Sequence, residues 1–293
     1  MINKFTPIQA KTLLSHVKQP DSWFGLKYNM NLYRGCQHQC IYCDTRSECY
    51  QIENFRNEIL IKENAIELLR KELSSKRVKG TIGLGSMNDP YMPVEKQHNL
   101  TRKCLEIIAE FRFPVHIITK SNLVLKDLEI LKKINKIYTA VSFTITTADD
   151  ELAKILEPGA PIPSERFKAM KKLSDNGILV GIVMMPILPF IQDNVENITG
   201  IIEKAHRNGV KYIIPSFGMT LRDRQRNYYY KKLDEHFPGM KQKYIRKFGN
   251  YSPCSVNNYS KLKQTFDEHC KNYGISKRII PYKKNASEQL KIF

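Results

Sequence analysis

The sequence predicts an α/β fold, a partial (β/α)6 barrel of parallel strands similar to an incomplete TIM barrel, and three observations lead to this prediction. Short apolar segments alternate with helical patterns, and the alternation recurs at roughly 30-residue intervals, as βαβ units require. Six such units occupy about 190 residues, which is too few for a complete eight-fold barrel. The segment from about residue 218 onward is basic and mainly helical in pattern, so we expect a C-terminal extension.

Six segments have the composition of buried parallel strands, which are short, apolar and often β-branched. They are Tyr28–Tyr33, Thr81–Ser86, Val115–Thr119, Tyr138–Thr144, Leu179–Met185 and Lys211–Ser216. Sheets of this kind carry their active sites at the carboxyl ends of the strands. Residues that directly follow these segments are therefore the first candidates for chemistry.

Helical patterns fill the connections between these strands. The apolar faces of the first two predicted helices contain Ile59, Ile66, Leu69 and Leu73, and then Leu100, Cys104, Ile107 and Ile108. Ser164 is expected to cap a helix that stops at Gly177. Asp193 or Asn194 is expected to open a further helix, which ends near Gly209.

The charge of the chain is strongly positive and unevenly distributed. The 293 residues contain 47 Lys/Arg and 29 Asp/Glu, a formal net charge of +18. Residues 201–293 contain 20 Lys/Arg and 7 Asp/Glu, a net of +13, together with 9 of the 15 tyrosines. Basic residues interleaved with aromatic ones suit a groove that binds phosphates and stacks bases. A solvated surface of a Lys-rich protein is the alternative interpretation.

This distribution suggests two domains. We expect residues 1–217 to form the barrel, with a functional loop at residues 34–49, and residues 218–293 to form the basic extension. The excess charge excludes no enzyme class, but it favours a polyanionic partner such as DNA or another nucleic acid.

A membrane role and a disulfide framework are both unexpected. The longest apolar run, Gly177 to Ile191, is too short to span a bilayer and contains two prolines. The N-terminus has no apolar signal core. We therefore expect a cytoplasmic protein, whose seven cysteines are metal ligands, catalytic groups or buried thiols.

The strongest signal is a group of three cysteines after the first predicted strand. Cys36, Cys40 and Cys43 have the spacing C-x3-C-x2-C, and thiolates on one loop suit zinc or an iron–sulfur cluster. A structural zinc ion normally takes four ligands, and His38, the nearest fourth ligand, would strain the loop. A [4Fe–4S] cluster with three cysteines instead leaves one iron open to a substrate or cofactor.

This motif, the aromatic Tyr42 before its last cysteine and the six-unit fold together resemble the radical S-adenosylmethionine (SAM) superfamily. The resemblance implies that Cys36, Cys40 and Cys43 bind a [4Fe–4S] cluster whose open iron chelates SAM. It further implies reductive cleavage of SAM to methionine and a 5′-deoxyadenosyl radical. An electron donor such as flavodoxin or ferredoxin is then required.

Further stretches resemble the spore photoproduct lyase-like subgroup, which includes proteins labelled DNA repair photolyases. They are Arg34-Gly-Cys, the run from Ser86 to Glu95, Thr119-Lys-Ser, and Glu157-Pro with Arg166 following. This resemblance covers roughly residues 24–217.

The resemblance also assigns candidate SAM contacts by position. Ser86 matches a SAM-contacting serine, Lys120 a lysine that pairs with the SAM carboxylate, and Ser142 a ribose contact. Asn88 and Asp89 lie in the loop that usually binds the SAM amino group, although Asp89 could instead start a turn.

Two later segments complete this assignment. The glycine-spaced run from Gly177 to Gly181 resembles the strand that supports adenine, with Met184 where a glutamate is common. Arg166 could bind an anion in the site, or it could be a surface residue of a helix with no role in the site.

The chain departs from the spore photoproduct lyase itself at positions that return a hydrogen atom to the product. Leu84 stands where the lyase has a cysteine, and Asp44 stands where it has the second of two tyrosines. These changes put the same repair reaction in doubt. The candidate hydrogen donors in this chain are Tyr42, Cys49 and Cys254.

The chain ends in Gln289-Leu290-Lys-Ile292-Phe293, which resembles the peptide by which bacterial replication and repair proteins bind the sliding clamp. A flexible end can order its apolar anchors in a pocket. Packing of these residues on the barrel is the alternative.

Three functions are compatible with these features. The first is a radical SAM enzyme acting on nucleic acid, in DNA repair or base modification. The second is a radical SAM enzyme that modifies a peptide or protein. The third is a zinc-stabilised nucleic-acid binding protein without catalysis.

Overall fold

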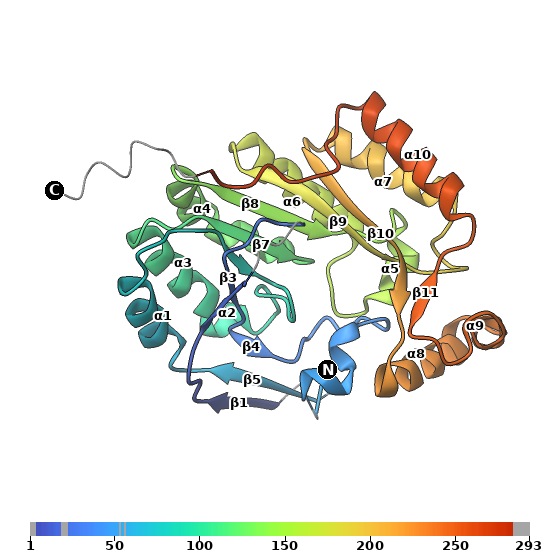
Figure 1. Cartoon of the computed structure of the whole chain (residues 1–293), viewed down its shortest axis with the longest axis horizontal. Helices are drawn as coiled ribbons and strands as arrows, with labels where there is room; N and C mark the ends of the chain where they lie inside the picture. The colour runs from blue at the N-terminus through green and yellow to red at the C-terminus, as the bar shows by residue number, and fades with distance from the viewer. Residues whose placement is uncertain (1–3, 19–22, 53, 56, 284–293) are drawn as a thin grey trace.

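The computed structural model describes residues 4–18, 23–52, 54–55 and 57–283, and it confirms the predicted fold class (Figure 1). Six parallel strands stand side by side in chain order. They are β3 (Tyr28–Met30), β6 (Ile82–Leu84), β7 (Val115–Thr119), β8 (Thr139–Thr144), β9 (Leu179–Ile187) and β10 (Tyr212–Thr220). Each overlaps one of the six predicted strands.

Short antiparallel strands flank this sheet at both edges. β2 (Leu14–His16) pairs with β3, and β11 (Pro253–Ser255) pairs with β10. The described part of the sheet is thus an open, curved partial barrel rather than a closed one.

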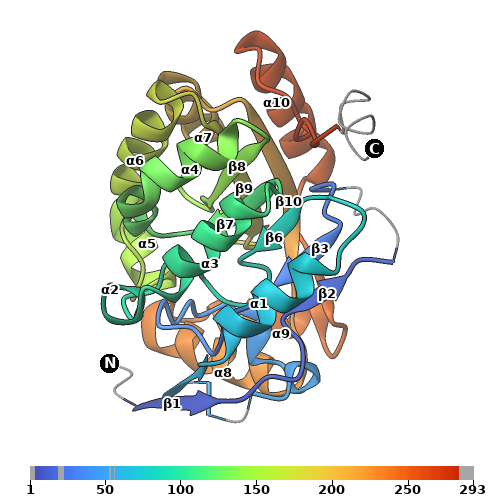
Figure 2. The same cartoon turned by 90° about the vertical axis from the view of Figure 1, so that its left-hand side faces the viewer.

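Helices cover the outer side of the curved sheet (Figure 1, Figure 2). They are α1 (Ala65–Ser74), α2 (Glu95–His98), α3 (Leu100–Glu110), α4 (Leu128–Asn135), α5 (Asp150–Leu156), α6 (Pro163–Asp175) and α7 (Val195–Arg207). Their apolar stripes, for example Leu69 and Leu73 of α1 with Ile107 and Ile108 of α3, are buried in one continuous core with the strands. The inner side of the sheet is left for the site.

The first predicted helix is confirmed as α1 for Ile66, Leu69 and Leu73, but its inclusion of Ile59 is wrong, because Ile59 lies in strand β5 (Glu58–Lys62). Burial in β5 alternates, with Ile59 and Ile61 inside, which is the two-residue period of a strand. β5 pairs with β1 (Lys4–Ile8) and with β4 (Tyr33–Arg34) in a separate small sheet. The predicted strand Tyr28–Tyr33 is therefore divided between two sheets.

Of two predicted helix starts, one is wrong and the other is confirmed. Ser164 is not a cap, because α6 already begins at Pro163, whose fixed φ suits the first helical position. Asn194 does cap α7, since its side chain accepts a hydrogen bond from the backbone of Asn197 at 2.8 Å.

The C-terminal segment is continuous with the barrel. β10 runs past residue 217 to Thr220, and three helices follow it: α8 (Asp223–His236), α9 (Met240–Phe248) and α10 (Tyr259–Asn272). α10 lies along α7 (Figure 1). Residues 284–293, with the clamp-like peptide, lie outside the described residues. Within the described helices, none is long and apolar enough to cross a bilayer.

Gly181 of β9 provides the space for a neighbouring aromatic ring. A Cβ at this position would lie 2.1 Å from the ring of Tyr212, its partner on β10. The room that this glycine leaves is thus filled by Tyr212.

We predict that Gly181→Ala lowers the free energy of unfolding by about 1–3 kcal/mol, because the added methyl overpacks the strand pair. Gly200→Ala on helix α7 is the matched control, since a Cβ at this position would meet no atom closer than 3.5 Å. The control is expected to gain up to about 1 kcal/mol. Equal unfolding midpoints for the two variants in urea would contradict this account.

Candidate active site

The loop that carries the three cysteines, residues 34–49, begins where the chain leaves the main sheet. β3 ends at Met30, and after β4 the chain turns at Gly35 with φ of +89°, a conformation that favours glycine. A Cβ at Gly35 would lie 2.7 Å from the carbonyl oxygen of Glu58. Pairing with the small sheet therefore fixes the start of this cluster loop.

The three cysteines of the cluster loop form no disulfide and lie close enough for neighbouring sulfurs to affect the pKa of Cys36 and of Cys40. Burial, the Asp89 carboxylate and Cys43 raise the pKa of Cys36 to about 12. Burial also raises the pKa of Cys40, whereas the nearby Lys120 ammonium acts in the opposite direction. Such buried sulfurs become thiolates when a metal centre supplies compensating positive charge.

This donor set fits an iron–sulfur cluster better than a zinc ion. Both ring nitrogens of His38 are engaged, Nδ1 at 2.9 Å from the carbonyl of Gly159 and Nε2 at 3.0 Å from Asp89. Among the residues described, no three His, Cys, Asp or Glu side chains gather tightly enough to hold one metal ion. In a [4Fe–4S] cluster each cysteine binds a different iron, so three separated thiols suffice.

Asp89 is buried and ties the cluster loop to the end of β7. Its carboxylate contacts His38 and accepts hydrogen bonds from Thr119 Oγ1 (2.7 Å), the Lys120 backbone (2.6 Å) and the Tyr91 backbone (2.8 Å). Burial opposes ionisation, but His38 and these donors lower the pKa of Asp89 to about 2. Asp89 is thus a fixed anion that positions the loop.

A second buried network lies beneath Tyr42. Glu157 accepts a hydrogen bond from the Tyr42 hydroxyl and pairs with Arg166 at 2.5 Å. Burial opposes ionisation of Glu157, but Arg166 and Lys120 lower the pKa of its carboxyl. Arg166 also donates to the carbonyls of Pro161 (2.7 Å) and Thr144 (2.9 Å), so it is fully used within the protein rather than exposed on α6.

Ser86 and Lys120 line one cavity, of about 460 Å³, inside the partial barrel. Ser86 Oγ accepts a hydrogen bond from Asn29 at 2.8 Å. The ammonium of Lys120 lies 4.0 Å from Glu157 and 5.8 Å from the centre of the Tyr42 ring. The two residues expected to contact SAM from the second and third strands therefore face the same space. We call this space the lumen cavity.

The other predicted SAM contacts have partners within the protein. Asn88 donates its side-chain amide to the carbonyl of Tyr33. Ser142 is buried between His116 Nε2 at 2.7 Å and the Tyr212 hydroxyl at 2.6 Å. Burial lowers the pKa of His116 to about 3, so this ring is neutral near pH 7.

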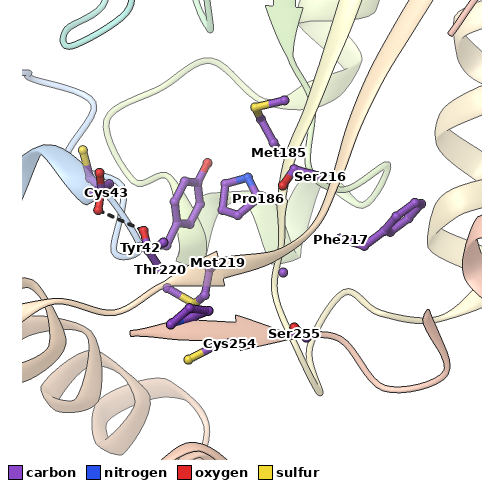
Figure 3. A pocket seen from close by; sticks show the side chains of 13 residues that line it. Tyr42, Cys43, Met185, Pro186, Ser216, Phe217, Met219, Thr220, Cys254 and Ser255 are labelled. Carbon is purple, nitrogen blue, oxygen red and sulfur yellow. Dashed lines mark hydrogen bonds between the residues drawn. The ribbon is translucent and has the colours of Figure 1, made fainter. Parts of the chain in front are cut away.

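A second cavity, of about 440 Å³, lies against the cluster loop, and we call it the reaction cavity. Tyr42, Cys43 and Asp44 line one side, and Ser216–Thr220 of β10 with Pro253–Ser255 of β11 line the other. Figure 3 shows Tyr42 lying between Cys43 and Pro186. Met185 lines both the reaction cavity and the lumen cavity, so the two spaces adjoin.

The three candidate hydrogen donors occupy different surroundings. Tyr42 and Cys254 line the reaction cavity. Cys254 shares its face of the strand pair with Met219 and belongs to the apolar cluster that contains Tyr229 and Tyr244. Cys49 is exposed, with its sulfur 3.8 Å from the Arg222 guanidinium.

Sequence patterns do not reveal the roles of three residues. Glu157 stands out only as part of a motif, yet it joins Tyr42, Lys120 and Arg166. In the sequence, His38 is a candidate only as a metal ligand, and His116 belongs to no motif. The signal for His116 is a polar residue in the apolar strand Val115–Thr119, which requires a buried partner.

The comparisons with known proteins agree with this geometry. The family model for the radical SAM superfamily matches residues 30–205. An uncharacterised protein of Methanocaldococcus jannaschii is 37% identical over 195 residues, which cover 66% of this chain and 71% of that protein. The radical SAM Nα-GlyT isomerase of Pseudomonas phage M6 is 23% identical over 227 residues, covering 70% of this chain and 47% of that protein.

Among solved structures, a cysteine-to-serine mutant of spore photoproduct lyase matches with a TM-score of 0.67 and 15% identity, covering 93% of this chain and 81% of that one. At this identity the match shows the fold alone. The matched family range contains all three cluster cysteines, Ser86 and Lys120. The chain therefore belongs to the radical SAM superfamily, whose cofactors are a [4Fe–4S] cluster and S-adenosylmethionine.

Proposed function

We propose that this radical SAM enzyme removes a hydrogen atom from a nucleic-acid substrate, a modified or damaged base, in DNA repair or base modification. One observation carries the proposal. The wall of the reaction cavity opposite Cys43 is built by β10 and β11, which belong to residues 201–293, where the net charge is +13. The residues of this wall are themselves uncharged, but the segment that supplies them carries most of the chain's excess positive charge, which attracts polyanions.

The named relatives are compatible with such a substrate. One matched lyase structure, with a TM-score of 0.66, holds a dinucleoside spore photoproduct. It provides a precedent for a nucleoside ligand on this fold, although at 14% identity the roles of individual residues cannot be transferred to this chain. A peptide or protein substrate would leave the excess positive charge of residues 201–293 without phosphates to meet.

The chain's own residues would have distinct tasks in this reaction. Cys36, Cys40 and Cys43 would hold the cluster, and Lys120, in the lumen cavity, would pair with the SAM carboxylate. When bound, the cofactors supply a carbon-centred radical, while the protein orients the substrate and excludes water. The adjoining cavities on either side of Met185 suit SAM in one and the substrate in the other.

Tyr42 is the best placed of the three candidate hydrogen donors. Its ring lines the reaction cavity beside Cys43. Burial and the adjacent Glu157 carboxylate raise the pKa of the phenol well above its usual value, so it keeps its hydrogen. Cys254 also lines the reaction cavity, but it belongs to the apolar cluster with the tyrosines of α8 and α9, and Cys49 is exposed.

Clamp binding through Gln289, Leu290, Ile292 and Phe293 rests on sequence alone. Such a tether would bring the enzyme to DNA. Its direct test is deletion of these residues, which would remove clamp binding and leave SAM cleavage intact.

We predict that replacing Cys36, Cys40 or Cys43 singly with alanine abolishes reductive SAM cleavage and lowers bound iron from about four atoms per chain, because each thiolate holds one iron. Iron analysis and product chromatography after anaerobic reconstitution measure both effects. Cys270→Ala, which removes a buried thiol of α10, is the control and should retain cluster and cleavage. Binding of zinc in place of iron, with no SAM cleavage, would contradict the proposal that this protein is an active radical SAM enzyme.

We predict that a nucleic acid deuterated at the reacting base transfers deuterium to 5′-deoxyadenosine, measured by mass spectrometry. Binding of this substrate should weaken as salt rises, because Lys and Arg side chains of the C-terminal segment displace counterions from phosphates, with a slope of about −0.7 to −0.9 per phosphate contacted. A deuterated peptide serves as the comparison. Transfer from the peptide and none from any nucleic acid would overturn the proposed substrate class.

We predict that wild-type enzyme in deuterated water incorporates deuterium into its product, because the phenolic hydrogen of Tyr42 exchanges with solvent. Tyr42→Phe should cleave SAM but lose this incorporation. Cys49→Ser and Cys254→Ser should retain it. Incorporation that survives in Tyr42→Phe and disappears in either cysteine variant would assign the donor differently.

A further inference from the structure

A third hollow, distinct from both cavities of the site, lies on the surface beside α10. It measures about 440 Å³ and lies between Trp23, the middle of β10 and the first turns of α10. Its aromatic members are Trp23, Phe217, Tyr259 and Phe266, and its cationic members are Lys263, Lys277 and Arg278. We call it the aromatic groove.

The rings of the aromatic groove are exposed to an unusual degree. Trp23 is 46% exposed and Tyr259 is 50% exposed, and both are large enough to lose considerable free energy by facing water. Tyr259 is held edge-on against Phe217, with 5.8 Å between the ring centres. Phe217 in turn packs against the buried Phe266 at 6.0 Å. The exposed ring of Tyr259 is therefore held in place by Phe217, which is itself packed against the core.

The net charge of the side chains that line the groove is positive. Lys263 and Lys277 share one carboxylate, Asp267, at 2.6 Å and 2.9 Å. Arg278 is exposed and forms no ion pair with any described residue. Three cations therefore face one anion, and the groove suits a partner with negative charge and flat apolar rings.

The aromatic groove adjoins the reaction cavity. Ser216 and Phe217 of β10 line both. Figure 3 shows the ring of Phe217 on the side of β10 away from Tyr42. A polymeric ligand that lies in the groove can thus reach the cluster loop by crossing β10.

We propose that the aromatic groove binds single-stranded nucleic acid, with bases stacked on Trp23 and Tyr259 and phosphates beside Lys263, Lys277 and Arg278. Base stacking on aromatic side chains combined with a positive groove is the way proteins hold single strands. In a duplex the base faces are covered by their neighbours, so an intact duplex offers nothing to these rings. The inference rests on the proposed function, since it presents a neighbouring nucleotide to the reaction cavity.

The chain contains one tryptophan, so its fluorescence reports on this groove alone. The test is a titration of the reconstituted enzyme with a short single-stranded oligodeoxynucleotide, the matching duplex and a polyglutamate peptide. Only the single strand should quench Trp23, with an affinity that falls as salt rises. Equal quenching by the duplex or by polyglutamate would overturn the proposal.

Variants then locate the binding surface by anisotropy of a labelled oligonucleotide. Tyr259→Ala and Trp23→Ala should each raise Kd between about 5-fold and about 150-fold through loss of a stacked base. Arg278→Gln should lower the salt slope by about 0.7. Tyr251→Ala is the matched control, because Tyr251 is 79% exposed but lies outside the groove, and its Kd should stay within about 2-fold. Thermal unfolding of each variant verifies the fold.

The outcomes separate this inference from the proposed function. One outcome is deuterium transfer from nucleic acid together with an unchanged Kd in Trp23→Ala and Tyr259→Ala. This outcome would refute nucleic-acid binding in the groove but would support the proposed function. Tight binding that these variants weaken, with no deuterium transfer from any nucleic acid, would support the groove and refute the function.

Discussion

The buried carboxylate of Asp89 holds together the parts from which the site is assembled. It contacts His38 of the cluster loop and accepts hydrogen bonds from Thr119 and Lys120 at the end of β7. An ionised group without water is costly unless every lone pair finds a partner. The loop and the strand end therefore have one arrangement that satisfies this anion, and that arrangement brings Cys40 close to Lys120.

The parallel strands and the cluster loop could be predicted from the sequence because their signals are local. The segment Leu179–Met185 of β9, for example, is a continuous apolar run, and the cysteine spacing lies within one loop. The small sheet could not be predicted, because β5 carries an apolar pattern that also fits the start of a helix. Only its pairing with β1, more than 50 residues earlier in the chain, decides for a strand.

The polar partners within the site depend on contacts that sequence position does not reveal. Glu157 meets Tyr42 across more than 100 residues, and Ser142 meets Tyr212 across 70. A serine on a strand looks the same in the sequence whether it faces a cofactor or a buried histidine. Ser86 and Lys120 line one cavity because each lies just past the end of one of two neighbouring parallel strands, whose carboxyl ends share an edge.

The three-residue strand β11 has a consequence for how this enzyme could diversify. It forms part of the reaction cavity's wall, yet it pairs only with the outermost parallel strand and contributes no cluster ligand. The family match ends at residue 205, before β10 begins. The cluster cysteines and the β10–β11 wall of the reaction cavity thus lie in separate, consecutive stretches of the chain. Recombination at a single point between α7 and β10 would give the same cluster loop a new cavity wall.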